Sequence, residues 1–320
     1  MFCAKFHFFL LFTLGLSIFF RKFAPMKLIA DSGSTKTSWV LAEGGSTVRR
    51  VSTAGINPVV QGEETIVSTL RELASQLDEK PTEIHFFGAG CRGEASLLMR
   101  KCLDVVFPDA VTEVESDLLG AARALFDDRE GIACILGTGS NSCLYDGKGI
   151  VENVPPLGFI LGDEGSGAAL GKAFINALFK GDLPEDMRRA YLEETGQTYE
   201  DIIRHVYREP NANRYLATTS LFISKHLDFK PLADIVEQNI ECFFTKNVDK
   251  YGRRDIPVGA VGSIAYVYAD TFRKVAERHG YRVEHIVKEP IEMLVKHIIE
   301  SYEKDINTNI HIAHCVRRNG

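Results

Sequence analysis

Residues 26–42 read MKLIADSGSTKTSWVLA, an apolar run that stops at a short turn of glycine and hydroxyl residues and then resumes. Lys27 to Ala30 is predicted to form a strand and Thr37 to Ala42 the strand that returns, with backbone N–H groups pointing into the turn between them. Residues 132–145, IACILGTGSNSCLY, repeat this order of strand, glycine-rich turn and strand. The repetition predicts a duplicated α/β fold in two similar domains rather than one doubly wound sheet.

The composition is that of a soluble globular protein. The chain has 320 residues, enough for two domains with a core each, and 45% of them are hydrophobic and 25% charged. A net charge of -6 excludes nucleic acid as the main partner, because a phosphate backbone selects basic surfaces. Seven cysteines without a CxxC pair predict buried, reduced thiols in a cytoplasmic protein.

Residues 1–25 form an apolar extension whose run from Phe6 to Phe20 is followed by Arg21 and Lys22. The run is shorter than the ~20 residues of a membrane-spanning helix. It also lacks the small-residue cleavage site of a signal peptide. We favour a third interpretation, in which the true start is Met26, and keep a membrane anchor as the alternative.

Apolar residues at helical or strand spacing predict the other elements. The predicted helices are 63–77, 94–106, 118–126, 165–179, 184–194, 199–206, 221–226, 231–248 and a final one that begins at Pro290. The predicted strands are 85–89, 111–114 and 256–261, and 256–261 is expected to be the last strand of the chain.

The first turn has the chemistry of a phosphate site. Its N–H groups, including that of Gly33, and its hydroxyls can hold phosphate oxygens, and Asp31 can hold Mg²⁺ through water. Lys36 is either a phosphate contact or a solvated surface charge. The hydroxyls concerned are those of Ser34, Thr35 and Thr37. An ordinary polar hairpin turn is the alternative for the whole stretch, which is not a Walker loop.

The second turn, at Gly137, Thr138 and Gly139, allows close backbone approach to a phosphate and offers a threonine hydroxyl. A third glycine-rich stretch, with Gly259, Gly262 and Ser263, follows a strand and precedes a helix that contains Tyr266 and Tyr268. A nucleoside could pack against this edge, although an ordinary junction of strand and helix has the same sequence. The three stretches together predict that ATP is held between two domains.

Asp117 is the predicted catalytic base. It stands after a predicted strand and before a predicted helix, between the two phosphate-type turns, where a carboxylate could accept the proton of an attacking hydroxyl. The alternative is that Ser116 or Asp117 only caps the helix. Asp163 and Glu164 begin another helix, and the residues alone do not exclude Asp163 as the base.

These motifs resemble the N-acetylglucosamine kinase branch of the BadF/BadG/BcrA/BcrD ATPase family, within the actin–hexokinase–Hsp70 superfamily. The resemblance covers roughly 26–297. It rests on DSGSTKT, GINPVVQG at 55–62, ESDLLGAARA at 115–124, LGTGSN at 136–141, PPLGFILGDEGSG at 155–167 and GAVGS at 259–263.

The resemblance implies two ribonuclease H-like domains with a cleft between them that closes over Mg²⁺-ATP and a sugar, usually in a homodimer. The expected domains are 26–115, with a C-terminal helix 289–303 packed back on it, and 116–288; residues 304–320 form a tail. The implied reaction is phosphorylation of a hexosamine, N-acetylglucosamine first among them, at its 6-hydroxyl. The implied substrate-binding residues are Asn57, Ser140, Asn141, Gly158 and Asp163.

One stretch departs from the family pattern. An aromatic residue and a histidine often precede GDE in the family, whereas Leu157 to Gly162 stands here. N-acetylmuramate, glucosamine and other hexosamines therefore remain alternative substrates.

Two rival functions are considered. An activator ATPase with an iron–sulfur cluster between two subunits needs exposed cysteines, and Cys91 stands in the one open-looking loop. A non-catalytic sugar sensor would bind sugar without ATP turnover.

Overall fold

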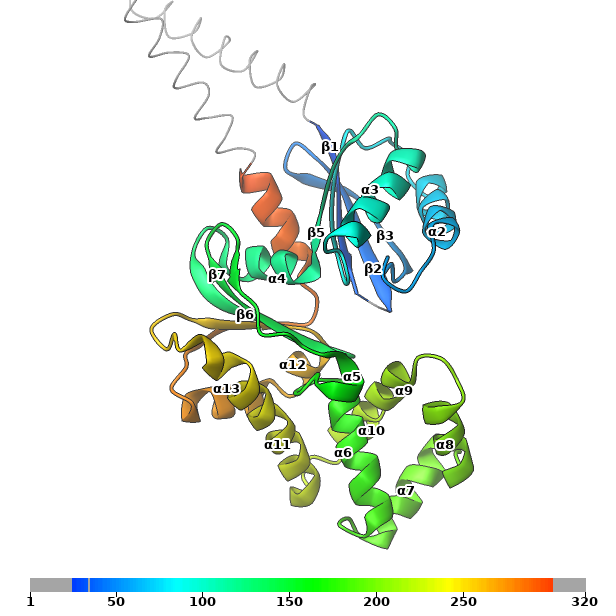
Figure 1. Cartoon of the computed structure of the whole chain (residues 1–320), viewed down its shortest axis with the longest axis vertical. Coiled ribbons are helices and arrows are strands. Elements are labelled where there is room, and N and C mark those ends of the chain that lie inside the picture. Colours follow the sequence, from blue (N-terminus) through cyan, green and yellow to red (C-terminus); the bar gives the residue numbers. More distant parts are fainter. Residues whose placement is uncertain (1–24, 34, 302–320) are drawn as a thin grey trace, which may run out of the picture. The chain divides into compact units, whose positions relative to one another are not determined.

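The computed structural model describes residues 25–33 and 35–301 (Figure 1). Ser34 and the expected tail 304–320 lie outside the described residues, as does the N-terminal extension except for Pro25. Within the described residues the chain divides into two compact units. One runs up to Asp117 and takes the chain up again at Leu294, and the other spans Leu118–Met293. The expected limits of the two domains, 26–115 and 116–288, stay a prediction.

The first unit contains a five-stranded sheet in the order β3-β2-β1-β4-β5. β1 pairs antiparallel with β2 and parallel with β4, so the sheet is mixed. Its strands are β1 (Met26–Ser32), β2 (Lys36–Glu43), β3 (Ser46–Ala54), β4 (Glu83–Gly88) and β5 (Val111–Ser116). Its helices are α2 (Glu63–Ser75) and α3 (Glu94–Val106).

Alternation along the strands places the core of this unit on one face of the sheet. Leu28 and Ala30 of β1 and Ile84 and Phe86 of β4 lie in one cluster with the buried side chains of α2 and α3. Ile29 lies between two of these residues in β1, so it points to the opposite face, where it is also fully buried. A last helix, 291–301, belongs to this unit from Leu294 onward.

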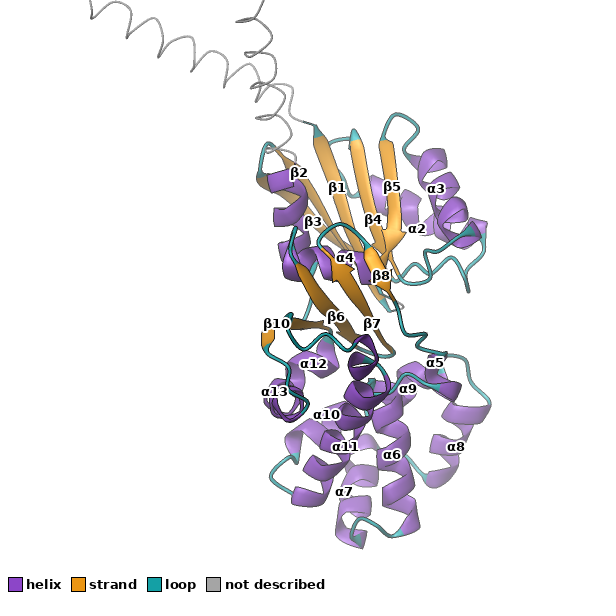
Figure 2. Cartoon of the chain, turned by 60° about the vertical axis from the view of Figure 1, so that its left-hand side comes forward, coloured by secondary structure: helices purple, strands orange, loops and turns teal. Residues whose placement is uncertain are grey.

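The second unit repeats the mixed five-stranded pattern in the order β10-β9-β6-β7-β8 (Figure 2). The strands are β6 (Glu130–Leu136), β7 (Ser140–Asp146), β8 (Ile150–Glu152), β9 (Val258–Val261) and β10 (Val283–Val287). Two sheets of this kind, each with helices, confirm the α/β class and the duplicated arrangement expected from the two turns.

Helices form much of the second unit. They are α4 (Asp117–Phe126), α5 (Gly158–Leu161), α6 (Gly167–Lys180), α7 (Glu185–Thr195), α8 (Tyr199–Tyr207), α9 (Ala212–Thr218), α10 (Ser220–Lys225), α11 (Lys230–Lys246), the 3₁₀ turn η1 (Val248–Tyr251), α12 (Ser263–Val267) and α13 (Ala269–Arg278). α4 packs with Ala133, Cys143 and Val261 of the sheet in one cluster. A second and larger cluster of this unit contains Cys134 and Val258 of the sheet together with side chains of α6, α11 and α13.

Local signals explain several boundaries. Ser166 caps α6 by accepting a hydrogen bond from the N–H of Ala169, and Gly181 ends the helix in the left-handed region with φ 90°. Thr198 and Asp201 form a reciprocal capping box at the start of α8.

Several elements differ from the sequence prediction, which does not include the strands β3 and β8. The expectation that 256–261 is the last strand is wrong, because β10 follows and pairs in parallel with β9. The helices α5 and α9 were not predicted either, since four and seven residues carry too little periodicity.

No helix within 25–33 and 35–301 combines the length and the apolar character that crossing a bilayer requires.

Candidate functional site

The carboxyl ends of three parallel strands meet at one edge of the first sheet. Ser32 at the end of β1 pairs with Gly88 of β4, which pairs with Ser116 of β5. The chain therefore leaves all three strands at what we call the first-sheet edge. Asp31 stands there in β1, and Asp117 follows β5 as the first residue of α4; both are partly exposed. Two acidic residues chosen from the sequence thus lie at the same edge.

The tip of the first turn is exposed. The N–H of Gly33 donates to the carbonyl of Lys36 at 3.0 Å, which closes the turn between β1 and β2. Gly33, Thr35 and Lys36 are all exposed to solvent. The tip of the turn therefore lies at the surface, and its role in binding phosphate stays a prediction. Ser34, the remaining residue of the tip, is not described.

Thr37 has a different place from the tip. It is fully buried, and its hydroxyl lies 2.6 Å from that of Ser32 and donates to the carbonyl of Ala54 at 3.3 Å. Thr37, one of the residues predicted to bind ATP, therefore packs beneath the turn and contributes little to its surface.

A loop that contains Asn57 is tied to the same edge. The Ser32 hydroxyl donates to the carbonyl of Ile56 at 3.0 Å and accepts from its N–H at 3.1 Å. Asn57 Oδ1 accepts from the N–H of Val59 at 3.0 Å. A Cβ at Gly90 would lie 2.4 Å from Asn57 Oδ1, so the side chain rests against the loop that follows β4. The structure therefore brings Asn57 to the first-sheet edge.

Cys91 lies near Asp117, and the sequence alone did not predict that proximity. Burial, followed by the charges of Asp117 and Glu115, raises the pKa of the Cys91 thiol to about 12. The thiol is 3% exposed. The expectation of an open loop at Cys91 is therefore wrong: Gly90 and Gly93, both with positive φ, fold the loop back so that the thiol is buried.

The second turn is joined to the start of α6. The N–H of Gly137 donates to the carbonyl of Gly139 at 2.9 Å. The N–H groups of Gly167 and Ala168 donate to the carbonyls of Gly137 and Thr138 at 2.8 and 3.1 Å. Because the first N–H groups of a helix have no partner inside it, these bonds satisfy them and fix the turn.

The third glycine-rich stretch meets this turn through Gly262. Gly262 has φ 115°, and a Cβ there would lie 2.3 Å from the carbonyl oxygen of Leu136 and 3.2 Å from the N of Gly137. Its N–H donates to the carbonyl of Val287 at 3.0 Å. Ser263 follows as the exposed first residue of α12. The structure thus brings Gly262 and Ser263 to the second turn, at what we call the second-sheet edge.

Gly259 and Tyr268 lie elsewhere. Gly259 stands inside β9 opposite Ala133, and a Cβ there would meet Phe126 of α4 at 3.0 Å. Packing against α4 therefore explains this glycine. Tyr268 is 2% exposed and its hydroxyl donates to the carbonyl of Ser220 at 3.1 Å, so it is a core residue. Tyr266 of α12 is exposed.

Asp163 is a buried carboxyl at the second-sheet edge. It is 7% exposed and has φ 54°. A Cβ at Gly139 would lie 2.9 Å from Asp163 Oδ2, so only glycine leaves room for the carboxyl. Burial raises its pKa to about 6, which the donating N–H of Ser140 and the charge of Lys172 oppose. The structure thus brings Asp163 beside Gly139 of the second turn, and their shared role in a site stays a prediction.

Ser140 and Asn141 begin β7 beside this carboxyl. The Ser140 hydroxyl donates to the carbonyl of Glu164 at 2.7 Å, so it links β7 to the loop of Asp163. Asn141 is partly exposed, and its Oδ1 accepts two hydrogen bonds, from the N–H of Ser142 and from Asn153.

Gly158 lies on α5, which precedes Asp163. Leu157 and Gly158 both have positive φ, and the N–H of Asp163 donates to the carbonyl of Pro156 at 2.9 Å, so this segment closes on itself. Lys172 of α6 donates to the carbonyl of Phe159 and so holds α5. Lys172 has no recognisable signal in the sequence, because its position on α6 is typical of a surface charge.

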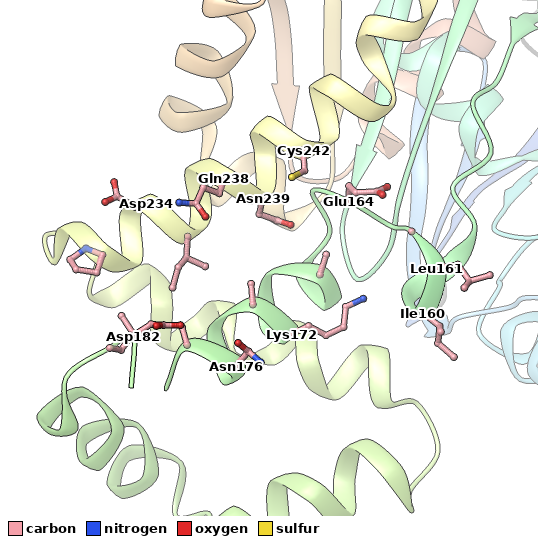
Figure 3. Close-up of a pocket in the computed structure, with 17 residues that line it drawn as sticks. Ile160, Leu161, Glu164, Lys172, Asn176, Asp182, Asp234, Gln238, Asn239 and Cys242 are labelled. Carbon is pink, nitrogen blue, oxygen red and sulfur yellow. The ribbon is translucent and has the colours of Figure 1, made fainter. Parts of the chain in front are cut away.

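A cavity of about 720 Å³ lies between α5, α6 and α11 (Figure 3). Its lining is mixed. Polar residues include Glu164, Lys172 and Asn239, and apolar residues include Ile160, Leu161 and several alanines of α6. None of the predicted site residues lines it. The cavity nevertheless adjoins the second-sheet edge, because Gly162 and Glu164 flank Asp163 and the charge of Lys172 acts on its carboxyl.

The chain offers a suitable place for one nucleotide-bound cation. Among the described residues no three His, Cys, Asp or Glu side chains gather as metal ligands. Mg²⁺ on a nucleotide needs only one or two carboxylates, because water and phosphate supply the rest. The partly exposed Asp31 beside the first turn fits that requirement.

Comparison with known proteins identifies the relatives of the chain. The sequence profile of the BadF/BadG/BcrA/BcrD ATPase family matches residues 30–182. The crystal structure of the "putative N-acetylglucosamine kinase" of Porphyromonas gingivalis shares 44% sequence identity, with a TM-score of 0.85, over 87% of this chain and 100% of that chain. No curated protein gives a match.

Two more distant structures share the fold. The "putative N-acetylglucosamine kinase" of Chromobacterium violaceum is 17% identical, with a TM-score of 0.66, over 86% of this chain and 99% of that chain. A ROK family glucokinase of Streptomyces griseus, solved with glucose and AMPPNP, is 14% identical with a TM-score of 0.58, over 85% and 97%.

Proposed function

Because the chain belongs to the BadF/BadG/BcrA/BcrD ATPase family, we propose that it is an ATP-dependent sugar kinase. We propose further that the acceptor is a hexosamine, N-acetylglucosamine first among them, and that the product is its 6-phosphate. The observation that carries the proposal is the identity with the P. gingivalis protein along that protein's whole length. The two sheet edges supply the side chains that such a reaction requires.

In the proposed reaction the sugar 6-hydroxyl attacks the γ-phosphorus of ATP. The new O–P bond forms as the bond to the β,γ-bridging oxygen breaks, so ADP leaves with that electron pair. Asp117 accepts the hydroxyl proton. The exposed residues of the first turn and the partly exposed glycines of the second turn contact the phosphates in this proposal. Asp31 would hold Mg²⁺, and the ion would neutralise phosphate charge when bound.

Sugar recognition is assigned to Asn57, Asn141 and Asp163, with Ser140 and Gly158 shaping their surroundings. Asp163 is suited to sugar hydroxyls because its burial strengthens hydrogen bonds to a carboxylate. Asp163 remains the rival for the role of base, since a pKa of about 6 also suits that role.

Asp117→Asn tests the assignment of the base. The amide cannot accept the proton, so we expect kcat to fall by about 10²- to 10⁴-fold while the KM for the sugar changes little. Steady-state ADP release measures both constants. The matched control is Asp109→Asn. Asp109 is exposed in the turn that precedes the first residue of β5, so this variant should retain full activity.

The same measurement on Asp163→Asn separates the two acids. If Asp163 binds sugar, its variant raises the KM for the sugar; if it is the base, its variant lowers kcat instead and Asp117→Asn stays active. Full activity of Asp117→Asn would overturn the proposed base.

The activator ATPase is the weaker candidate. It needs exposed cysteines in a suitable loop, and among the five described cysteines only Cys242 is exposed, on the helix α11. Iron content in the purified protein would support that alternative.

A further inference from the structure

The oxygen of the Asn141 side chain is fully occupied by the protein. Asn141 Oδ1 accepts from the N–H of Ser142 at 2.9 Å and from Asn153 Nδ2 at 2.9 Å. A carbonyl oxygen has two lone pairs, so both are used. No described residue accepts from Asn141 Nδ2, and the side chain is partly exposed. What Asn141 offers to a ligand is therefore its NH₂ group.

The main chain fixes the orientation of Asn153. Its Nδ2 also lies 2.7 Å from the carbonyl oxygen of Ser142 and 3.0 Å from that of Val154. The reversed amide would place an oxygen against three acceptors, which would leave them unsatisfied. Asn153 must therefore present its NH₂ group to Asn141, and Asn141 must receive it with its oxygen.

Tyr251 of η1 anchors this arrangement from behind. Its hydroxyl lies 2.8 Å from Ser142 Oγ and accepts from the N–H of Val154 at 3.1 Å. The ring is 7% exposed, and burial raises the pKa of its hydroxyl to about 12, so the group is neutral at ordinary pH. Tyr251 thereby joins the segment after β8 to β7.

We infer that Asn153 is a positioning residue that makes Asn141 a hydrogen-bond donor only, so that the acceptor sugar must present an oxygen to it. A ring hydroxyl oxygen or the carbonyl oxygen of an N-acyl group meets this requirement, whereas the ammonium group of an unacylated amino sugar does not. The inference rests on the proposed function and deepens it, because it names the partner of Asn141 as an oxygen of the sugar, either a hydroxyl oxygen or an acyl carbonyl oxygen. The residues come from two loops and a strand that the sequence does not connect.

The test is a double-mutant cycle on the full chain. We expect Asn153→Ala to raise the KM for the sugar about tenfold while the KM for ATP changes less than twofold. In the Asn141→Ala background the same change should have no further effect on the sugar KM, because Asn153 acts through Asn141. Asn176→Ala, an exposed asparagine of α6, is the matched control without effect.

Tyr251→Phe keeps the ring and removes one hydroxyl, so it is the substitute test if Asn153→Ala does not fold. We expect it to raise the KM for the sugar by less than Asn153→Ala does. Additive effects of Asn141→Ala and Asn153→Ala, or an equal rise in the KM for ATP, would contradict the inference, since both indicate a general loss of structure.

A readout without turnover keeps the inference separate from the proposed function. In ¹⁵N-asparagine-labelled protein, the side-chain NH₂ of Asn153 should be protected from solvent exchange and that of Asn141 should exchange rapidly. The two signals are assigned by their loss in the single variants. If no sugar stimulates turnover, the proposed function fails while this pattern still decides the orientation. A protected Asn141 NH₂ would overturn the inference.

Discussion

Asp163 shows how the protein keeps an acidic side chain inside. Its main chain is in the left-handed region, which costs free energy for a non-glycine residue, and its carboxyl is almost fully buried beside Gly139. The N–H of Ser140 and the charge of Lys172 offset only part of the burial, so the pKa stays raised at about 6. A residue held at such a cost is expected to serve a ligand rather than the stability of the fold.

The raised pKa of Asp163 makes the free energy of unfolding depend on pH in a defined direction. The folded state holds the Asp163 proton more tightly than the unfolded state, so this carboxyl stabilises the fold fully below pH 3.8, and that contribution is lost as the pH rises through about 6. Asp163→Asn removes the titration. The variant should therefore be more stable than the wild type at pH 7.5, by on the order of 1–2 kcal/mol, and the difference should be clearly smaller at pH 4.5.

Urea unfolding at the two pH values measures this difference. Asp182→Asn, a change at an exposed aspartate of the same unit, should leave the stability difference independent of pH. A difference for Asp163→Asn that is the same at pH 4.5 and 7.5 would show that the carboxyl is not perturbed by burial.

The strands and helices of the second unit are joined tightly around the second turn. β6 ends at this turn, α6 begins with two hydrogen bonds to its carbonyls, and Gly262 at the start of α12 packs on it. The turn is thus held from two helices that lie far apart in the sequence. Such a rigid support suits a loop that must hold phosphate groups in a fixed place.

Gly262→Ala should disturb this junction. Its φ of 115° is strained for any residue with a Cβ, and the new methyl group would lie 2.3 Å from the carbonyl oxygen of Leu136. We expect a loss of about 2–4 kcal/mol in the free energy of unfolding, together with a higher KM for ATP. Gly149→Ala, where no described atom lies within 4 Å of the added Cβ, should change stability by less than about 0.5 kcal/mol. Equal stability of the two variants would refute the close contact.

Sequence patterns predicted the elements with strong local signals and missed those that depend on distant partners. The turns after β1 and β6, the helix α3 and the carboxyl-end position of Asp117 follow from local composition. β10, with Glu284 and His285 inside it, is a partly exposed edge strand without an apolar alternation, so only its pairing with β9 reveals it.

Part of the site was also beyond a local pattern. The contact of Asn153 with Asn141 spans 12 residues, and Tyr251 reaches Ser142 across 109 residues. Gly259 was assigned to ATP because the motif GAVGS is read as a unit, whereas the packing of Phe126 on β9 explains that glycine. Burial of Cys91 likewise depends on how its loop folds against β4 and β5.

Considered as a whole, the molecule consists of two units that each have their own mixed sheet and core. Each unit gathers candidate residues at the carboxyl edge of its sheet, Asp31 and Asp117 in the first and Gly139 and Asp163 in the second. The proposed kinase requires both sets to act on the same substrates, so neither set alone is expected to support turnover.

The most direct measurement is ADP release by the purified full chain with Mg²⁺-ATP, across N-acetylated sugars, unacylated amino sugars and plain hexoses. We predict turnover that depends on the sugar, with N-acetylglucosamine giving the highest kcat/KM and yielding its 6-phosphate. Slow ADP release that no sugar increases would contradict the account and favour an activator-type ATPase. Sugar binding without any ADP release would contradict it as well, in favour of a sensor.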